Sequence, residues 1–342
     1  MSDSKANNPP VPQKTNTQPL LGTSPHIVSP INTRKIMACV LISLTPVTIA
    51  GIFLFGLKAL FTILVSITAA ELGEFLFRKI TGQAPRNNDL SAAISGLLLA
   101  LCLPPGTPLW MTALGAIFAI IIAKEFFGGL GANIFNPALI GRAFLLMSFP
   151  AAMTTWPAPL GGSAAATTDA LTGATPMALI KAGNALDSLG PHYSDIIKTL
   201  FLGNHPGCIG ESSILAILLG LIFLLCTKVI DWQSPASMLA TVFLLSIPLG
   251  RDPLIAVLGG GLAFGAVFMA TDYVTSPLTV KGKIIFGCGA GIITVLIRQW
   301  GAYPEGVTYS ILIMNALTPY LNRLLPKKYG YVKPVKAKEE TK

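Results

Sequence analysis

Long stretches of this chain contain no charged residue, and this feature limits the structures it can adopt more than any other. Three clear cases are Ile36–Phe55, Ile214–Cys226 and Ile255–Met269. A helix of about 20 apolar residues spans the hydrocarbon core of a bilayer, and several runs approach that length. Hydrophobic residues make up 52% of the chain and charged residues 11%, whereas soluble domains carry about 25% charged residues. We therefore expect an all-α polytopic membrane protein.

The apolar runs between charged residues, prolines and glycines predict about ten transmembrane helices. Their approximate bounds are 36–57, 59–77, 90–103, 110–124, 137–149, 213–228, 236–249, 254–270, 284–299 and 307–325. The expected organisation is a disordered N-terminal segment (1–33), a first five-helix half (34–149), a long loop (150–212), a second five-helix half (213–326) and a basic tail (327–342).

Lysines and arginines gather at alternate ends of these runs, which predicts the orientation of the chain. They are Arg34, Lys35, Arg78, Lys79, Arg86, Lys124, Lys281 and Lys283. The loop 150–212 contains only Lys181 and Lys198. By the positive-inside rule, both termini face the cytoplasm and the loop 150–212 lies outside the cytoplasmic (inner) membrane. The net charge of +9 is therefore a topology signal, and no nucleic-acid partner is expected.

Two features suggest that the two halves form an inverted repeat. Asn136–Pro137 in the first half corresponds to Asn315 and Pro319 in the second. The third span of each half is also interrupted, by Leu103–Pro104–Pro105 and by Gly259–Gly260–Gly261. Paired interrupted helices indicate a binding site at a repeat interface. Chance is the alternative, because glycine and proline are common in membrane helices.

Charged groups inside hydrocarbon are expected to have partners, because inserting each one costs ~2.5–3.5 kcal/mol. Arg142 in the fifth span and Asp272 at the end of the eighth should therefore mark sites or ion pairs. We interpret Glu71, Glu74 and Lys124–Glu125, near the ends of their spans, as membrane-interface residues instead.

Several familiar site motifs are missing from the sequence. No HExxH spacing, Walker loop or GxGxxG after a strand occurs, so the chain is not expected to bind a catalytic metal, ATP or NAD by itself. The five cysteines form no CxxC pair, which favours small buried residues over a disulfide or metal framework. A cluster shared with a partner subunit stays open as an alternative.

The segment Asp169-Ala170-Leu171-Thr172-Gly173-Ala174-Thr175-Pro176 is small and rich in hydroxyl groups. Its backbone N–H groups could face an anion such as phosphate, although most loops of this composition have no such role. The pattern Asp-x-x-Thr-Gly-Ala-Thr resembles the motif at which a flavin transferase attaches FMN in membrane subunits of Rnf complexes and of sodium-pumping NADH:quinone oxidoreductases. The resemblance implies a phosphoester on Thr175, with Asp169, Thr172, Gly173 and Ala174 as the recognition frame. The expected outward position of the loop suits an exported transferase.

Further motifs extend this resemblance over most of residues 24–325. They are Ser24-Pro25-His26, Leu98–Pro105, Lys124–Gly129, Asn133–Ala138, Gly141–Phe144, Gly207–Ser213, Ala270-Thr271-Asp272 and Tyr303–Val307. The compact N-terminal region is more similar to the D subunit of Rnf than to the B subunit of the quinone oxidoreductase, in which this region is typically longer.

The resemblance also implies a second, noncovalent flavin, riboflavin, between helices nearer the cytoplasm. Asn133, Asn136 and Arg142 are the candidates, because amide and guanidinium groups can hydrogen-bond the isoalloxazine edge. The alternative is that these side chains cap an interrupted helix or join two helices. Glu211 precedes the sixth span on the side expected for Thr175, where it either stabilises the N-terminus of that helix or shapes the FMN pocket.

Together these motifs imply a flavin-carrying subunit, not catalytic alone, of an Rnf-type complex that transfers electrons between ferredoxin and NAD and translocates Na⁺ or H⁺. The implied partners are iron–sulfur subunits, a second covalent-FMN subunit and small membrane subunits, together with the flavin transferase during maturation. One alternative is a subunit of the NqrB type in a Na⁺-translocating NADH:quinone oxidoreductase. The other is a urea-channel-like solute transporter built on inverted five-helix repeats, which leaves the motif ending at Thr175 to chance.

Overall fold

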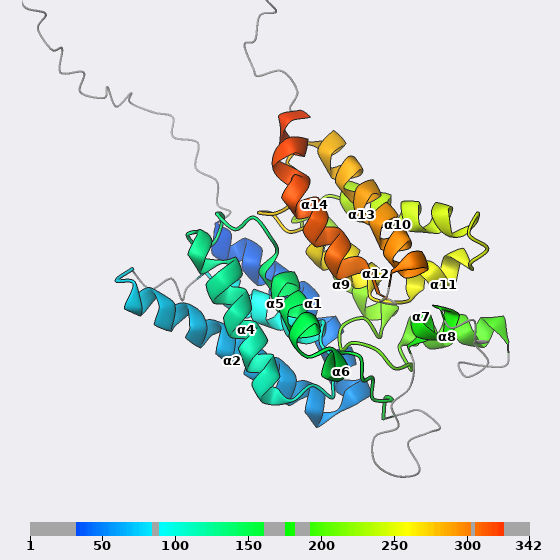
Figure 1. Ribbon diagram of the computed structural model, residues 1–342, viewed down its shortest axis with the longest axis horizontal. Coiled ribbons are helices and arrows are strands. Elements are labelled where there is room, and N and C mark those ends of the chain that lie inside the picture. Colours follow the sequence, from blue (N-terminus) through cyan, green and yellow to red (C-terminus); the bar gives the residue numbers. More distant parts are fainter. Residues whose placement is uncertain (1–31, 84–88, 161–174, 182–191, 302–304, 325–342) are drawn as a thin grey trace, which may run out of the picture. The chain divides into compact units, whose positions relative to one another are not determined.

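The computed structural model describes residues 32–83, 89–160, 175–181, 192–301 and 305–324 (Figure 1). Within these residues the regular structure is entirely helical. Up to residue 160 it comprises α1 (Thr33–Phe55), α2 (Leu57–Ile80), α3 (Ser91–Leu101), α4 (Leu109–Ala123), η1 (Glu125–Phe127), α5 (Pro137–Ser148) and α6 (Pro150–Met153). From residue 175 it comprises α7 (Pro176–Lys181), α8 (Tyr193–Leu202), α9 (Ile214–Cys226), α10 (Gln233–Ser246), α11 (Pro253–Leu258), α12 (Leu262–Phe264), η3 (Gly265–Met269), α13 (Val280–Trp300), α14 (Val307–Leu321) and η4 (Asn322–Leu324).

Each predicted apolar run coincides with a helix or, for 254–270, with the series α11, α12 and η3. Among the described residues, four helical segments are long and apolar enough to cross a membrane: Thr33–Phe55, Leu57–Ile80, Leu109–Phe127 and Val280–Trp300. Large apolar side chains also cover outward faces, as at Phe53 and Ile80. These observations confirm the all-α class and indicate a membrane protein. The count of ten crossings stays a prediction, because the other apolar helices are shorter.

The predicted interruption of the eighth span lies at Gly259–Gly261. Asp252 caps α11 by accepting hydrogen bonds from the N–H groups of Leu254 and Ile255. The helix ends at Leu258, and Gly260 and Gly261 adopt φ angles of +68° and +65°. Glycine adopts this left-handed region without the steric penalty of a side chain. The chain then resumes as α12 and the π-helix η3. The break therefore leaves backbone groups of Gly259–Gly261 outside any helix, in the interior of the bundle.

Within each of the two halves, the helices pack against one another in a similar set of pairs. In the first half, α2 packs against α3 and α4, α4 against α5, and α3 against α1 and α5 (Figure 1). In the second half, α10 packs against α11 and α13, α13 against α14, α9 against α12, and η3 against α14. The halves meet where α1 contacts α9 and where α5 contacts α14. Counted by order along each half, five of these pairs recur in the second half, whereas the contacts of α1 with α2 and of α3 with α4 have no comparable counterpart among the described residues there.

The predicted long loop 150–212 contains three described helices, α6, α7 and α8. After α8 the chain folds back against the end of α3, because Ile209 and Gly210 donate backbone hydrogen bonds to the carbonyls of Leu103 and Leu101. Ser213 then caps α9 by accepting from the N–H of Ala216. This return segment brings Glu211 into the interior, where it is 5% exposed.

Candidate functional site

A cavity of about 80 Å³ lies where α3, α4 and α5 approach the segment that follows η3. Its lining is mostly apolar, with polar groups from Ser91, Lys124, Asn133, Asn136 and Asp272. An apolar cleft with a few convergent polar groups is the usual form of a small-molecule or cofactor site. The structure therefore brings two of the predicted flavin ligands, Asn133 and Asn136, to one cavity.

Both asparagines also have structural roles. The side-chain oxygen of Asn136 accepts the N–H of Ala138 at 3.0 Å and caps α5, with Pro137 as the first helical residue. The side-chain NH₂ of Asn133 donates to the carbonyl of Phe135 at 3.1 Å. The capping alternative is thus observed for Asn136. The cap engages only the oxygen of that amide, which leaves its NH₂ group for other interactions.

Arg142 does not join the asparagines. It lies on α5 six residues beyond the cap, about 9 Å along the helix axis. It lines a separate small cavity together with Cys102, Cys208, Glu211 and other residues. Its Nη2 atom donates to Glu305 at 2.6 Å and approaches the Sγ of Cys208 at 3.4 Å. The sequence predicted that Arg142 has a partner but did not identify it. In the structure that partner is Glu305, 163 residues away.

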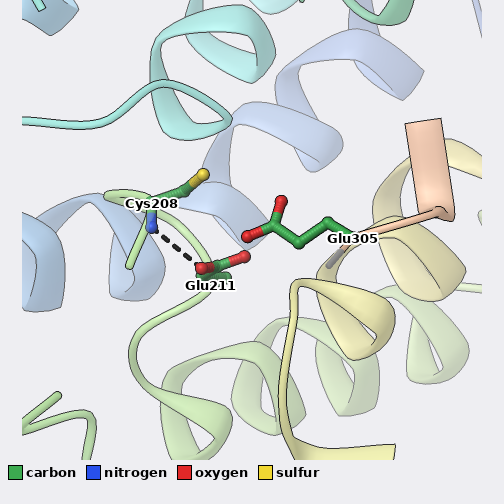
Figure 2. Close-up of side chains that lie close together, drawn as sticks. All are labelled: Cys208, Glu211 and Glu305. Carbon is green, nitrogen blue, oxygen red and sulfur yellow. Dashed lines mark hydrogen bonds between the residues drawn. The ribbon is translucent and has the colours of Figure 1, made fainter. Parts of the chain in front are cut away.

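Glu211 belongs to this second cavity. Its Oε1 atom accepts the backbone N–H of Cys208 at 2.9 Å. Figure 2 shows its carboxylate and that of Glu305 directed toward one another, with Cys208 beside them. The carboxylate makes no hydrogen bond with the first turn of α9, which Ser213 caps instead. Ser213 therefore provides the hydrogen-bonded cap of α9, and a favourable effect of the Glu211 charge on the helix dipole stays a prediction.

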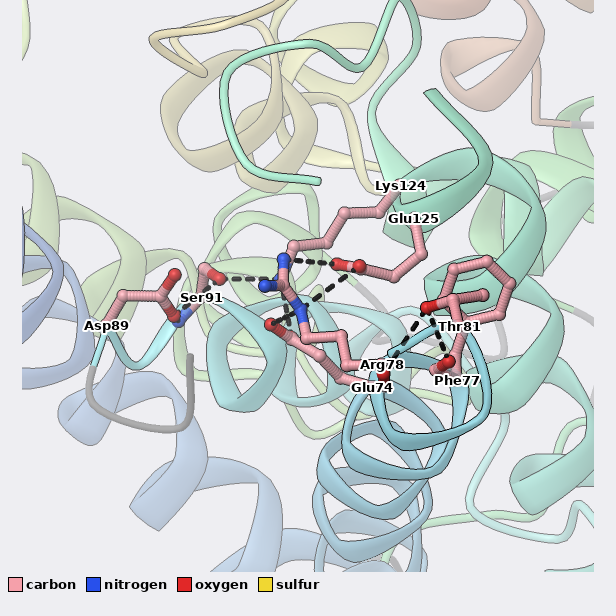
Figure 3. A network of polar contacts seen from close by, with 8 residues as sticks. All are labelled: Glu74, Phe77, Arg78, Thr81, Asp89, Ser91, Lys124 and Glu125. Carbon is pink, nitrogen blue, oxygen red and sulfur yellow. Dashed lines mark hydrogen bonds and ion pairs between the residues drawn. The ribbon is translucent and has the colours of Figure 1, made fainter. Parts of the chain in front are cut away.

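The acidic and basic residues near the ends of α2 and α4 differ from the interface position predicted for them. Lys124 donates to Glu74 at 2.7 Å and to the hydroxyl of Ser91 at 2.6 Å (Figure 3). Arg78 pairs with Glu125 at 3.1 Å and with Glu74 at 3.5 Å.

We call Glu74, Arg78, Lys124 and Glu125 the α2–α4 network. Its members are only 2–3% exposed, whereas Glu71 is exposed as expected. The interface prediction was wrong for Glu74, Lys124 and Glu125, because each is covered by packing between helices that are distant in sequence.

Asp272 was expected to have a partner inside the membrane, and a neighbouring hydroxyl group provides one. Thr275 donates to its Oδ2 atom at 3.0 Å. The cysteine prediction holds for Cys102 and Cys208, which are buried, whereas Cys39 and Cys288 are only partly buried and Cys226 is exposed.

Thr175 lies immediately before α7, and its side chain is buried at 1% exposure. Its hydroxyl oxygen accepts the N–H of Ala178 at 3.2 Å. Two residues on, Met177 packs so closely on the break after α11 that a Cβ built on Gly260 would lie 2.8 Å from it. The segment carrying Thr175 therefore contacts the interrupted eighth run. The rest of the motif, namely Asp169, Thr172, Gly173 and Ala174, lies outside the described residues.

Two groups of buried polar residues thus lie at different places in an apolar helical bundle. One surrounds a cavity near Asn133 and Asn136, and the other joins Arg142, Glu211 and Glu305 beside the break that Met177 contacts. This arrangement defines a helical membrane protein with an internal, mostly apolar cavity and buried charges.

Comparison with known proteins assigns the family. The model of the NQR2, RnfD, RnfE family matches residues 20–330, and the chain belongs to this family. The chain is 44% identical over 321 residues to the D subunit of the proton-translocating ferredoxin:NAD(+) oxidoreductase complex of Clostridium ljungdahlii, covering 91% of this chain and 96% of that one.

Other relatives show the same pattern. The D subunit of the Na(+)-translocating ferredoxin:NAD(+) oxidoreductase complex of Acetobacterium woodii is 42% identical, over 92% of this chain and 96% of its own length. The D subunit of the ion-translocating oxidoreductase complex of Stutzerimonas stutzeri is 39% identical, over 86% and 92% of the two chains. Near-complete coverage in both directions means that the resemblance involves the whole helical bundle.

Proposed function

We propose that this chain is the flavin-carrying D subunit, embedded in the membrane, of an Rnf-type ferredoxin:NAD oxidoreductase complex that translocates an ion. One observation carries the proposal: the sequence from Asp169 to Thr175 matches a flavin-attachment motif in a chain whose relatives are D subunits along their whole length. The names of these relatives favour this assignment over an NqrB-type subunit or a solute transporter. Partners would be the other subunits of the complex and, during maturation, a flavin transferase.

The proposed covalent cofactor is FMN on Thr175. The hydroxyl oxygen already accepts the N–H of Ala178, and an ester oxygen can accept the same hydrogen bond. The side chain is buried, however, and Met177 fills the space against Gly259 and Gly260. Attachment therefore requires that residues 175–181 be modified before they pack, or that they move away from the break.

The proposed noncovalent cofactor is riboflavin in the cavity lined by Asn133 and Asn136. The apolar lining suits the faces of an isoalloxazine ring, and the NH₂ groups of the amides suit its carbonyl edge. The ammonium group of Lys124 also reaches this cavity, where it would favour negative charge on a bound ring. When bound, flavins supply one-electron transfer, and the protein positions them and sets the surrounding charge.

The coupling ion does not follow from similarity. The relatives at 44% and 42% identity are named for proton and for Na⁺ translocation, respectively. Relatives named for either ion are therefore almost equally similar to this chain in sequence identity. The coupling ion must be argued from the residues of this chain.

The proposal includes the predicted topology: a cytoplasmic (inner) membrane location, both termini in the cytoplasm and residues 150–212 outside. The distribution of lysine and arginine supports this orientation. The helix pairs that occur in both halves support a repeat. With an odd number of crossings in each half, the second half would have the opposite orientation in the membrane.

In-gel fluorescence of the denatured chain tests the covalent flavin. Protein matured together with its transferase should keep flavin fluorescence after denaturation, and Thr175→Ala should abolish it. Thr155→Ala, an exposed threonine outside the motif, is the matched control and should remain fluorescent. Loss of signal in the control, or retention in Thr175→Ala, contradicts attachment at Thr175.

Acid extraction tests the second cofactor. Asn133→Ala should release less riboflavin per chain than wild type while its fluorescent band stays unchanged. Asn204→Ala, at an exposed amide, is the control. Equal riboflavin in both variants contradicts the assignment of this cavity.

A further inference from the structure

Two buried carboxylates face each other beside the break at Gly259–Gly261. The ligand atoms of Cys208, Glu211 and Glu305 all lie within 4.8 Å of one another (Figure 2). Glu211 is 5% exposed, and the side chain of Glu305 is 11% exposed. A cavity of about 10 Å³, room for about one water molecule, adjoins Glu211.

Each carboxylate uses one oxygen and leaves the other without a partner. Oε2 of Glu305 accepts from Arg142 at 2.6 Å, and Oε1 of Glu211 accepts the N–H of Cys208 at 2.9 Å. Oε1 of Glu305 and Oε2 of Glu211 have no hydrogen-bond partner among the described residues. Buried polar atoms are rarely left unsatisfied, and two ionised carboxylates cannot bond each other, because both only accept. A cation between them would satisfy both atoms.

The surroundings favour a proton over a metal ion. Hard metal cations bound by oxygen take about six ligands, whereas this cavity is the size of one water molecule. The guanidinium of Arg142 already occupies the space beside Glu305 and Cys208. The thiol of Cys208 donates to the carbonyl of Cys102 at 3.0 Å and so is engaged elsewhere. A proton needs only two carboxylate oxygens, one as donor and one as acceptor.

We infer that Glu211 and Glu305 form a proton-binding pair, in which Glu211 takes up one proton on Oε2 and donates it to Oε1 of Glu305. Uptake converts one carboxylate and one proton into a neutral acid, while Glu305 stays ionised against Arg142.

The other ionisable groups around the pair do not replace this proton. They are the thiols of Cys102 and Cys208 and the guanidinium of Arg298 on α13. Arg298 donates to the backbone carbonyls of Ala256, Gly259 and Gly260.

The break connects this pair to the segment of Thr175. A Cβ built on Gly261 would lie 2.6 Å from Oε2 of Glu211, and Gly259 and Gly260 contact Met177. If Thr175 carries the flavin proposed above, proton uptake by the pair offsets the negative charge that an electron brings nearby. This coupling rests on the proposed function, whereas the proton-binding pair does not.

Infrared spectroscopy of the purified complex tests the pair directly. Wild type should show the carbonyl stretch of a buried protonated carboxyl group, with a shift in D₂O, and Glu211→Gln should lose it. Asp195→Asn, at a partly exposed carboxylate paired with Lys198, should keep it. Absence of the band in wild type, or its persistence in Glu211→Gln, overturns the inference. Loss of the band when Na⁺ replaces K⁺ at constant ionic strength also overturns it, because the occupant is then Na⁺.

A second measurement uses the asymmetry of the pair. Glutamine at 211 keeps an acceptor for Cys208 and gains an N–H donor for Glu305, so Glu211→Gln should assemble with wild-type yield. Glu305→Gln loses the ion pair with Arg142 and should assemble less well. Equal losses in both variants contradict a proton on Glu211. Thr175→Ala should keep the infrared band, so failure of the flavin proposal and failure of this inference are distinguishable.

Discussion

The α2–α4 network and the Glu211–Glu305 pair with Arg142 are both buried, yet their charges are arranged differently. In the network, Glu74 pairs with Lys124 and Arg78, and Arg78 also pairs with Glu125. At the pair, Arg142 is ion-paired with Glu305 and also approaches the Sγ of Cys208, and Glu211 has a backbone N–H as its partner. Buried charges persist only when they are paired or neutralised. The network is therefore complete, with both carboxylates ion-paired, whereas Glu211 has no ion-pair partner among the described residues.

The largest expected effect comes from breaking the complete network. Lys124→Ala leaves Glu74 with a longer contact to Arg78 alone, in an interior site. Removing one partner of a buried ion pair costs about 3–5 kcal/mol, and we expect a loss of this size in the free energy of unfolding.

Denaturant unfolding of the purified chain in detergent measures this difference. Lys198→Ala is the control, because Lys198 is exposed and its contact with Asp195 is 3.6 Å long. The control should stay within about 0.5 kcal/mol of wild type. A Lys124→Ala variant as stable as the control contradicts the description of the network as complete.

A smaller effect is expected where the pair contacts the break. Gly261→Ala places a methyl group in the left-handed region and 2.6 Å from Oε2 of Glu211, so it should cost about 2–3 kcal/mol and displace that carboxylate. Gly82→Ala is matched in φ, at +70°, but has open space around it, so it should cost about 1–2 kcal/mol. Thermal unfolding of both variants measures the difference, and equal losses contradict a tight contact at Gly261.

The smallest effect concerns His205 in the return segment before α9. Burial lowers the pKa of its imidazole, while the hydrogen bond to the carbonyl of Pro206 opposes that shift. The unfolded state therefore binds more protons below the ordinary pKa of 6.5, and the contribution of neutral His205 is complete above pH 6.5 and lost as the pH falls.

Between pH 7 and about pH 5, the free energy of unfolding should fall with decreasing pH. The titration of His205 should account for at most about 1.4 kcal/mol of this fall per pH unit. His205→Gln should flatten the profile, whereas His192→Gln, at an exposed histidine, should leave it unchanged. Identical slopes in all three proteins contradict the role of burial at His205.

The sequence predicted the helices far better than the contacts between them. Apolar runs located all the long helices of the described residues, because insertion in hydrocarbon imposes the same apolar pattern on every span. The glycines at 259–261 likewise predicted a break. The pairing of Arg142 with Glu305 did not follow, since it depends on how α5 and the segment before α14 approach each other.

The same limit explains the error at Lys124. A lysine at the end of a span usually reaches the membrane interface, but here α2 covers it and Glu74 neutralises it. Composition near a helix end does not reveal which neighbouring helix lies over it.

Peptide mapping by mass spectrometry of the native complex tests the central claim most directly. The account predicts that the peptide containing Thr175 carries the mass of FMN joined through a phosphoester, with fragmentation placing it on that residue. An unmodified Thr175 in protein matured with its transferase, or flavin on a different residue, would contradict the account.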